Sequence, residues 1–75
     1  MNLKPIKANM TELTISDNLV VLFSYQTPVA AMTQEGYIKT EKNWSRTTSR
    51  HINQWLPIGG KVTVKPQEYF DNLVK

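Results

Sequence analysis

The apolar run at residues 19–23, Leu-Val-Val-Leu-Phe, constrains the fold more than any other segment. A strand with one face toward solvent alternates apolar and polar side chains, whereas this run is apolar at both parities. Such a strand is stable only where both of its faces are covered or where it lies centrally. The run therefore predicts a strand in the middle of a sheet.

Two hairpins are predicted around this central strand. Residues 11–15 alternate polar and apolar side chains, and residues 16–18, Ser-Asp-Asn, supply turn chemistry before the apolar run. Residues 28–40 predict a second hairpin, in which Pro28 marks either a strand start or an edge. These segments together predict an antiparallel meander of four strands.

A helix is predicted over residues 46–56, where the apolar period changes. At about 100° per residue, the side chains of Thr48, Ile52, Trp55 and Leu56 gather on one side. The arginines at positions 46 and 50 lie on the other side and face away from the core. The helix is expected to end at residues 57–60, Pro-Ile-Gly-Gly, because proline cannot continue it and glycine permits left-handed turns.

The end of the chain predicts a short strand and a second helix. Residues 61–65 alternate as a strand, and Pro66 suits the first position of a helix. Residues 69, 70, 73 and 74 are apolar at helical spacing, so this helix should dock its aromatic side on the sheet.

The expected fold class is α+β, with a small antiparallel sheet of four or five strands packed against one amphipathic helix plus a short C-terminal helix. The 75 residues suffice for one domain, which we assign to residues 11–75. Residues 1–10 are expected to form a flexible N-terminal lead-in, since Lys4, Pro5 and Lys7 break any period there.

Composition restricts the chemistry and the compartment. The chain has no cysteine, which removes disulfides and thiolate metal ligands and is typical of a reducing cytoplasm. No long apolar run and no cleavage pattern is present, so neither a signal peptide nor a membrane anchor is expected. The net charge of +3 decides little by itself. Basic side chains are nevertheless concentrated between residues 39 and 50, where Glu41 is the one acid.

The start of the predicted helix is the candidate site. A helix N-terminus carries partial positive charge, yet hydroxyls and arginines stand where acids would be expected, which suggests that an external anion completes the site. Any of Asn43, Ser45, Thr47 and Thr48 could be the N-cap. Backbone N–H groups, hydroxyls and guanidinium groups all suit phosphate oxygens. The candidate nucleic-acid-binding residues are Lys39, Lys42, Trp44, Ser45, Arg46, Thr47, Ser49 and Arg50.

A simpler interpretation of the same residues stays open. The basic segment can be a solvated helix surface whose arginines pair with Glu41 or with acids elsewhere in the fold. Trp44 can grip single-stranded nucleic acid by stacking, or it can be buried. A thin core uses its large side chains, which favours burial of Trp55 strongly and burial of Trp44 slightly.

His51 is the only histidine of the chain. A metal site would need carboxylates that the nearby sequence does not offer, so no metal site is expected. With Arg46, Arg50, Glu41 and Tyr37, His51 could in principle support RNA cleavage as a general base, which we rank third among the functions. No other catalytic motif and no cofactor-binding motif is present, and we predict no catalytic residues and no cofactor.

Part of the chain resembles a known domain family. The likeness rests on Gly36-Tyr37, on Thr47-Thr48-Ser49 and on His51-Ile52-Asn53 with Trp55-Leu56, and it extends back to Leu19. These segments resemble a small uncharacterised domain carried by phages, other mobile elements and some prokaryotes. The resemblance implies a small accessory protein that acts inside a bacterial or archaeal cell. It implies no functional residues.

The sequence thus predicts a small non-enzymatic module that binds nucleic acid through phosphate-backbone contacts at a basic helix N-terminus. The alternative is a protein-interaction module, such as a phage or mobile-element accessory protein that binds a host protein or self-associates as a homodimer. No membrane partner is expected, and the localisation expected is the cytoplasm, which is that of the host if a phage encodes the chain.

Overall fold

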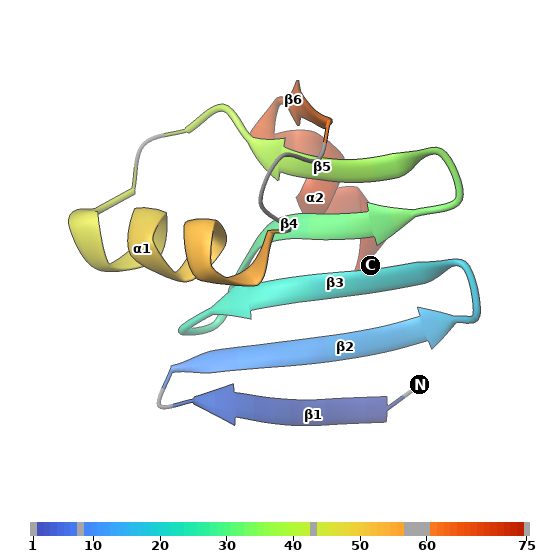
Figure 1. The fold of residues 1–75 in the computed structure, drawn as a ribbon, viewed down its shortest axis with the longest axis horizontal. Helices are drawn as coiled ribbons and strands as arrows, with labels where there is room; N and C mark the ends of the chain where they lie inside the picture. The colour runs from blue at the N-terminus through green and yellow to red at the C-terminus, as the bar shows by residue number, and fades with distance from the viewer. Residues whose placement is uncertain (1, 8, 43, 57–60, 75) are drawn as a thin grey trace.

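A computed structural model describes residues 2–7, 9–42, 44–56 and 61–74. Within these ranges the chain forms one sheet of six strands in sequence order, with two helices packed against it (Figure 1). The α+β class is confirmed, and the sheet has six strands rather than four or five. The elements are β1 (Asn2–Lys7), β2 (Met10–Ser16), β3 (Leu19–Ser24), β4 (Thr27–Thr33), β5 (Gly36–Thr40), α1 (Arg46–Trp55), β6 (Val62–Lys65) and α2 (Gln67–Leu73).

The strands β1 to β5 form an antiparallel meander, and β6 is parallel to β5. The expected sheet was entirely antiparallel, and β6 is the exception. Parallel neighbours need a long crossover between them, and the segment that contains α1 supplies it. The four-strand meander predicted for residues 11–40 corresponds to β2 through β5 and is confirmed.

The central position of β3 is also confirmed. Val21 and Leu22 are both fully buried, although they point to opposite faces of the sheet. Leu22 joins the cluster that Ile52 of α1 covers, while Val21 joins the cluster that Phe70 of α2 covers. Figure 1 shows the reason, because α1 lies in front of the sheet and α2 lies behind it. The apolar run of β3 therefore serves two cores, one on each face.

Most of the segment expected to be a flexible N-terminal lead-in, residues 1–10, lies in the strands β1 and β2. The strand β1 pairs with β2 along the edge of the sheet, with Leu3 opposite Leu13. The side chain of Leu3 is 69% exposed and that of Ile6 is 38% exposed. Because backbone pairing holds this edge and its apolar side chains stay in solvent, the sequence shows no burial pattern. Met10 opens β2 and is only 1% exposed, so it belongs to the core.

Pro28 lies at the second position of β4, opposite Phe23. The register between β3 and β4 shifts at this point, between Leu22 and Phe23. Proline cannot donate to a ladder and is tolerated inside sheets at strand starts and bulges. The prediction of a strand start is confirmed, and β4 is an interior strand.

The turn between β4 and β5 depends on Gly36. Its φ is 130°, a value that L residues rarely adopt, and Thr33 Oγ1 donates to its carbonyl oxygen at 2.8 Å.

The helix α2 docks as predicted through Phe70, which is fully buried, with Leu73 and Val74 packed beside it. Pro66 is the N-cap of α2 rather than its first helical residue, a difference of one position. Residues 57–60, where a stop of the first helix was predicted, lie outside the described residues. Neither α1 nor α2 has the length and apolar character that crossing a membrane requires.

Candidate nucleic-acid interface

The helix α1 begins at a serine cap. Ser45 has extended backbone angles, and its Oγ accepts a hydrogen bond of 3.1 Å from the backbone N–H of Thr48. The structure therefore selects Ser45 among the candidate caps that it describes, while Asn43 lies outside the described residues. The N–H groups of residues 46 and 47 have no acceptor within the helix, since the first turn of any helix leaves such donors open.

A network of buried and partly buried polar side chains holds the start of α1 on β3. The hydroxyl of Ser24, which is 2% exposed, donates to Thr48 Oγ1 at 3.1 Å, and Ser45 Oγ donates to the same oxygen at 3.2 Å. Ser24 Oγ also lies 2.8 Å from Nδ1 of His51. The tautomer of the His51 ring decides which of these two atoms donates. Helix and strand are thus locked together below the exposed surface.

The two arginines of α1 are exposed and face away from this network. Among the described residues, neither Arg46 nor Arg50 has an ion-pair or hydrogen-bond partner, and the first turn of α1 contains no acid. Like charges at this spacing on a helix repel each other by about 0.2 to 0.5 kcal/mol. A cation in the first turn opposes the helix dipole by about 0.3 to 1 kcal/mol. The positive charge here is therefore not neutralised by the described part of the chain.

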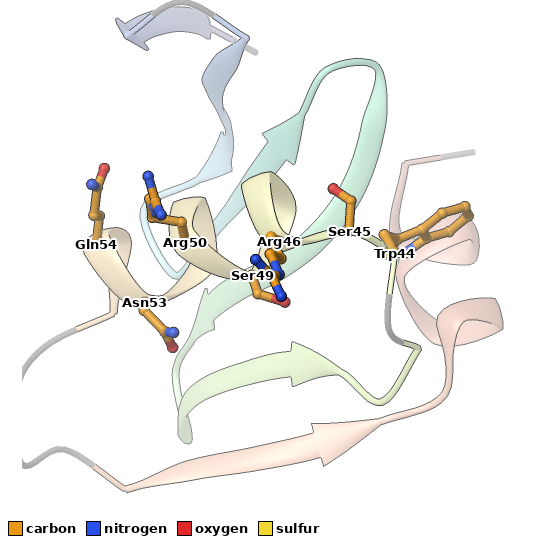
Figure 2. Close-up of a pocket in the computed structure, with 7 residues that line it drawn as sticks. All are labelled: Trp44, Ser45, Arg46, Ser49, Arg50, Asn53 and Gln54. Atoms are coloured by element: carbon orange, nitrogen blue, oxygen red, sulfur yellow. The ribbon is translucent and has the colours of Figure 1, made fainter.

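An open hollow of about 680 Å³ lies along this side of α1. Figure 2 shows its side chains projecting outward along the helix, from Ser45 at one end to Gln54 at the other, with Trp44 beyond the helix start. Six of the seven lining residues are polar or charged, and Trp44 is the exception. The lining residues are Trp44, Ser45, Arg46, Ser49, Arg50, Asn53 and Gln54.

A second hollow of about 330 Å³ adjoins the first and shares Ser49 and Asn53 with it. It brings in Lys39 of β5 and Lys42 from the segment that follows β5. Lys39 pairs across the sheet with Ala30, which packs under α1, so the lysine lies on the α1 face. Seven of the eight predicted residues therefore line the two adjoining hollows, while the exposed Thr47 lines neither.

The two tryptophans have different environments. Trp55 is half-buried and packs against the cluster under α1, so the burial predicted for it is met in part. Trp44 is 41% exposed, so the slight preference for its burial was wrong. Its indole N–H donates to Oε1 of Gln67 at 3.1 Å, and the ammonium of Lys42 lies 4.1 Å from the ring centroid. A residue of α2 thus accepts the hydrogen bond of the indole N–H, and this contact holds the ring of Trp44 without packing in the core.

The model of a family of unknown function, DUF8033, matches residues 1–72. The chain belongs to the DUF8033 family. The match includes β1, so the residues expected to form a lead-in are part of the region that this family shares. Neither a curated protein nor a solved structure shows a match to the chain.

In this DUF8033 domain, the residues considered for RNA cleavage do not all lie together. His51 faces Ser24, and its ring lies 6.0 Å from that of Tyr25. Tyr37 instead packs edge-on against Trp55, with ring centroids 5.8 Å apart. Within the described ranges, no group of three or more His, Asp or Glu side chains is placed to hold a metal ion.

Two residues that support the site in the DUF8033 domain escaped sequence reasoning. Ser24 lies two residues after Leu22 in β3, so its side chain is on the same face of the sheet and places a hydroxyl beneath α1. This spacing is a signal that sequence reasoning could have used. Gln67 gave no signal, because its contacts join segments far apart in sequence: it accepts from Thr40 Oγ1 at 2.8 Å and donates to the carbonyl of Pro28 at 2.8 Å.

Proposed function

We propose that this domain is a non-enzymatic module that binds nucleic acid by its phosphate backbone. The observation that carries the proposal is the pair Arg46 and Arg50, which are exposed and have no acidic partner among the described residues. A surface salt-bridge network would have placed carboxylates beside them. An unneutralised pair of guanidinium groups, with Arg46 in the first turn of the helix, favours an anionic ligand.

The neighbouring groups suit phosphate oxygens. Guanidinium groups bind phosphate through paired N–H donors, and a lysine contributes a point charge. Arg46 and Arg50 line one hollow while Lys39 and Lys42 line the hollow beside it, so a strand with several phosphates can engage both. The N–H groups of the first turn of α1 add donors at the same end.

Contacts to the phosphate backbone discriminate little between base sequences. Phosphate contacts fix the position and orientation of a nucleic acid, while base edges carry the sequence information. Binding should therefore tolerate many sequences and weaken as the salt concentration rises.

A charge-reversal titration tests the proposal. Fluorescence anisotropy of labelled DNA and RNA would be measured at two salt concentrations with wild type and with the double variant Arg46→Glu/Arg50→Glu. Lys61→Glu is the matched control, because the parallel register places Lys61 beyond Val62, at the Gly36 end of β5 and away from Lys42. We expect tenfold or greater weakening in the double variant and less than about a twofold change in the control. Equal binding by all three proteins would refute the proposal.

A protein-interaction module is the second candidate, and β1 is the observation that favours it. The strand has one neighbour, β2, and exposes 69% of Leu3 at the edge of the sheet. An extended segment of a host protein or of a second copy could add to such an edge by main-chain pairing. Pull-down from host lysate with and without nuclease separates the candidates: a partner retained after nuclease supports this one.

The setting we propose is the cytoplasm of a prokaryotic cell, with the gene on a phage or another mobile element. The absence of cysteine from the sequence supports a reducing compartment.

A further inference from the structure

Trp44 is displayed at the surface with its polar edge turned inward. The residue is 41% exposed, and the only polar atom of its side chain, the indole nitrogen, donates its proton to Gln67 Oε1 at 3.1 Å. Trp55 in the same chain contributes to a core cluster and makes an edge contact with Tyr37. A small domain gains stability by burying large aromatic side chains, so an exposed tryptophan needs another explanation.

Gln67 fixes the position of this ring. Its Oε1 accepts from Trp44 and, at 2.8 Å, from Thr40 of β5. Its Nε2 donates to the carbonyl of Pro28 in β4 at 2.8 Å and to Asp71 Oδ1 in α2 at 3.1 Å. An amide group with all of these bonds made has one orientation. The indole is therefore preorganised by two strands and a helix, although it lies outside them.

One cation lies over the same ring, and two more line the hollow beside it. The ammonium of Lys42 stands 4.1 Å from the ring centroid, and the hollow that begins at Trp44 continues past Arg46 to Arg50. An aromatic ring beside a basic track is the arrangement by which proteins bind single strands, with bases stacked on rings and phosphates on cations. A duplex keeps its bases stacked inside and cannot present a free face to the ring.

We propose that Trp44 is a stacking platform for an unpaired base, so that the ligand of this surface is single-stranded nucleic acid. The inference rests on the proposed function, since the phosphates of the same strand would bind at Arg46 and Arg50. Gln67 acts as a positioning residue that holds the platform in place. A base that stacks on the ring face below Lys42 displaces the ammonium, which then meets a phosphate.

The test compares two labelled single strands of equal length at low salt, one of thymidines and one of abasic sites. The abasic strand keeps the phosphates and lacks the bases. For wild type, anisotropy titration should give an affinity for the thymidine strand about 5- to 150-fold higher than for the abasic strand. Trp44→Ala should remove this preference while keeping the affinity for the abasic strand. Trp44→Phe should retain most of the preference, because a phenyl ring also stacks.

Tyr69→Ala is the matched control. Tyr69 is also an exposed aromatic residue, at 39%, with the ammonium of Lys65 5.6 Å from its ring centroid. It lines neither of the two adjoining hollows, so its removal should leave the preference unchanged. Thermal unfolding followed by circular dichroism shows whether each variant is folded.

The outcomes separate the two proposals. Equal affinity of wild type for both strands, with Arg46→Glu/Arg50→Glu still weakening binding, would overturn the stacking platform and leave phosphate binding intact. A preference that survives in folded Trp44→Ala, or that is lost in Trp44→Phe as well, would also overturn the platform. No binding of either strand by wild type would overturn the stacking platform, and no binding of duplex DNA or duplex RNA in addition would overturn both proposals.

Discussion

The indole N–H of Trp55 donates a hydrogen bond of 2.7 Å to Oε1 of Glu12. This contact joins the last turn of α1 to β2, which are 43 residues apart in sequence. It also engages a carboxylate of the α1 face at the end of the helix opposite to Arg46. Glu12 thus anchors the last turn of the helix and does not pair with Arg46 or Arg50, while Glu41 lines the second hollow beside Lys39 and Lys42.

The Trp55–Glu12 contact should contribute measurably to stability. A hydrogen bond to a charged group contributes about 1.5 to 3 kcal/mol when buried, and this half-buried one should give less. In a double-mutant cycle of Trp55→Phe and Glu12→Ala, we expect a coupling free energy of about 0.5 to 1.5 kcal/mol from urea unfolding. Glu12→Gln keeps an acceptor and serves as the control. A coupling near zero would show that the bond does not hold α1.

Substitutions of Ser45 should separate capping from ligand binding. Ser45→Ala removes the acceptor for the Thr48 N–H and should lower the free energy of unfolding by about 1 kcal/mol, or about 4 to 8 °C in Tm. Ser45→Asp restores a cap and should unfold no earlier than wild type. Its negative charge beside Arg46 should nevertheless weaken binding of nucleic acid in anisotropy titration. Undiminished binding by Ser45→Asp would place the ligand elsewhere.

Arg46→Glu should stabilise the fold while it weakens binding. The change places an acid in the first turn of α1 and removes the repulsion from Arg50, so the free energy of unfolding should rise by about 0.3 to 1 kcal/mol. Urea unfolding measures this gain, and Lys61→Glu provides the comparison outside the helix. A loss of stability in Arg46→Glu would mean that the arginine has a structural partner and is not held free for an anionic ligand.

Tyr25 carries backbone strain that substitution should reveal. Its φ is 59°, in the left-handed region, and its side chain is 51% exposed. Asparagine tolerates this region far better than a β-branched residue does. We expect Tyr25→Asn to be more stable than Tyr25→Val by about 1 kcal/mol or more in urea unfolding. Equal stabilities would indicate that the turn relaxes to another conformation.

Local chemistry in the sequence was enough to predict most of the elements. Local patterns predicted the strand β3 from its apolar run, the turn before it from its turn residues and the helix α1 from its apolar period. Ser45 was among the predicted caps. The pairing of strands that are far apart in the sequence could not be predicted from such local patterns. The parallel pairing of β6 depends on the path of the crossover, and β1 is held by backbone pairing that its exposed Leu3 does not reveal.

The candidate site was predictable in its residue types and not in its architecture. The concentration of basic residues in the sequence identified Arg46 and Arg50 as candidates. The alternation of side chains along β5 places Lys39 on the same face of the sheet as α1. The exposure of Trp44 could not be predicted, because it depends on Gln67, whose partners lie on β4, β5 and α2. Hydrogen bonds between distant segments have no periodic signature in a sequence.

Binding of nucleic acid at the basic end of α1 can be observed residue by residue in a two-dimensional ¹H–¹⁵N NMR titration of the labelled domain with a short single-stranded oligonucleotide at low salt. We predict that the largest shift changes occur at the backbone amides of residues 44–50 and at Lys39 and Lys42, and that added salt reverses them. Shift changes confined to β1 and β2, or none at millimolar oligonucleotide, would contradict binding at this surface.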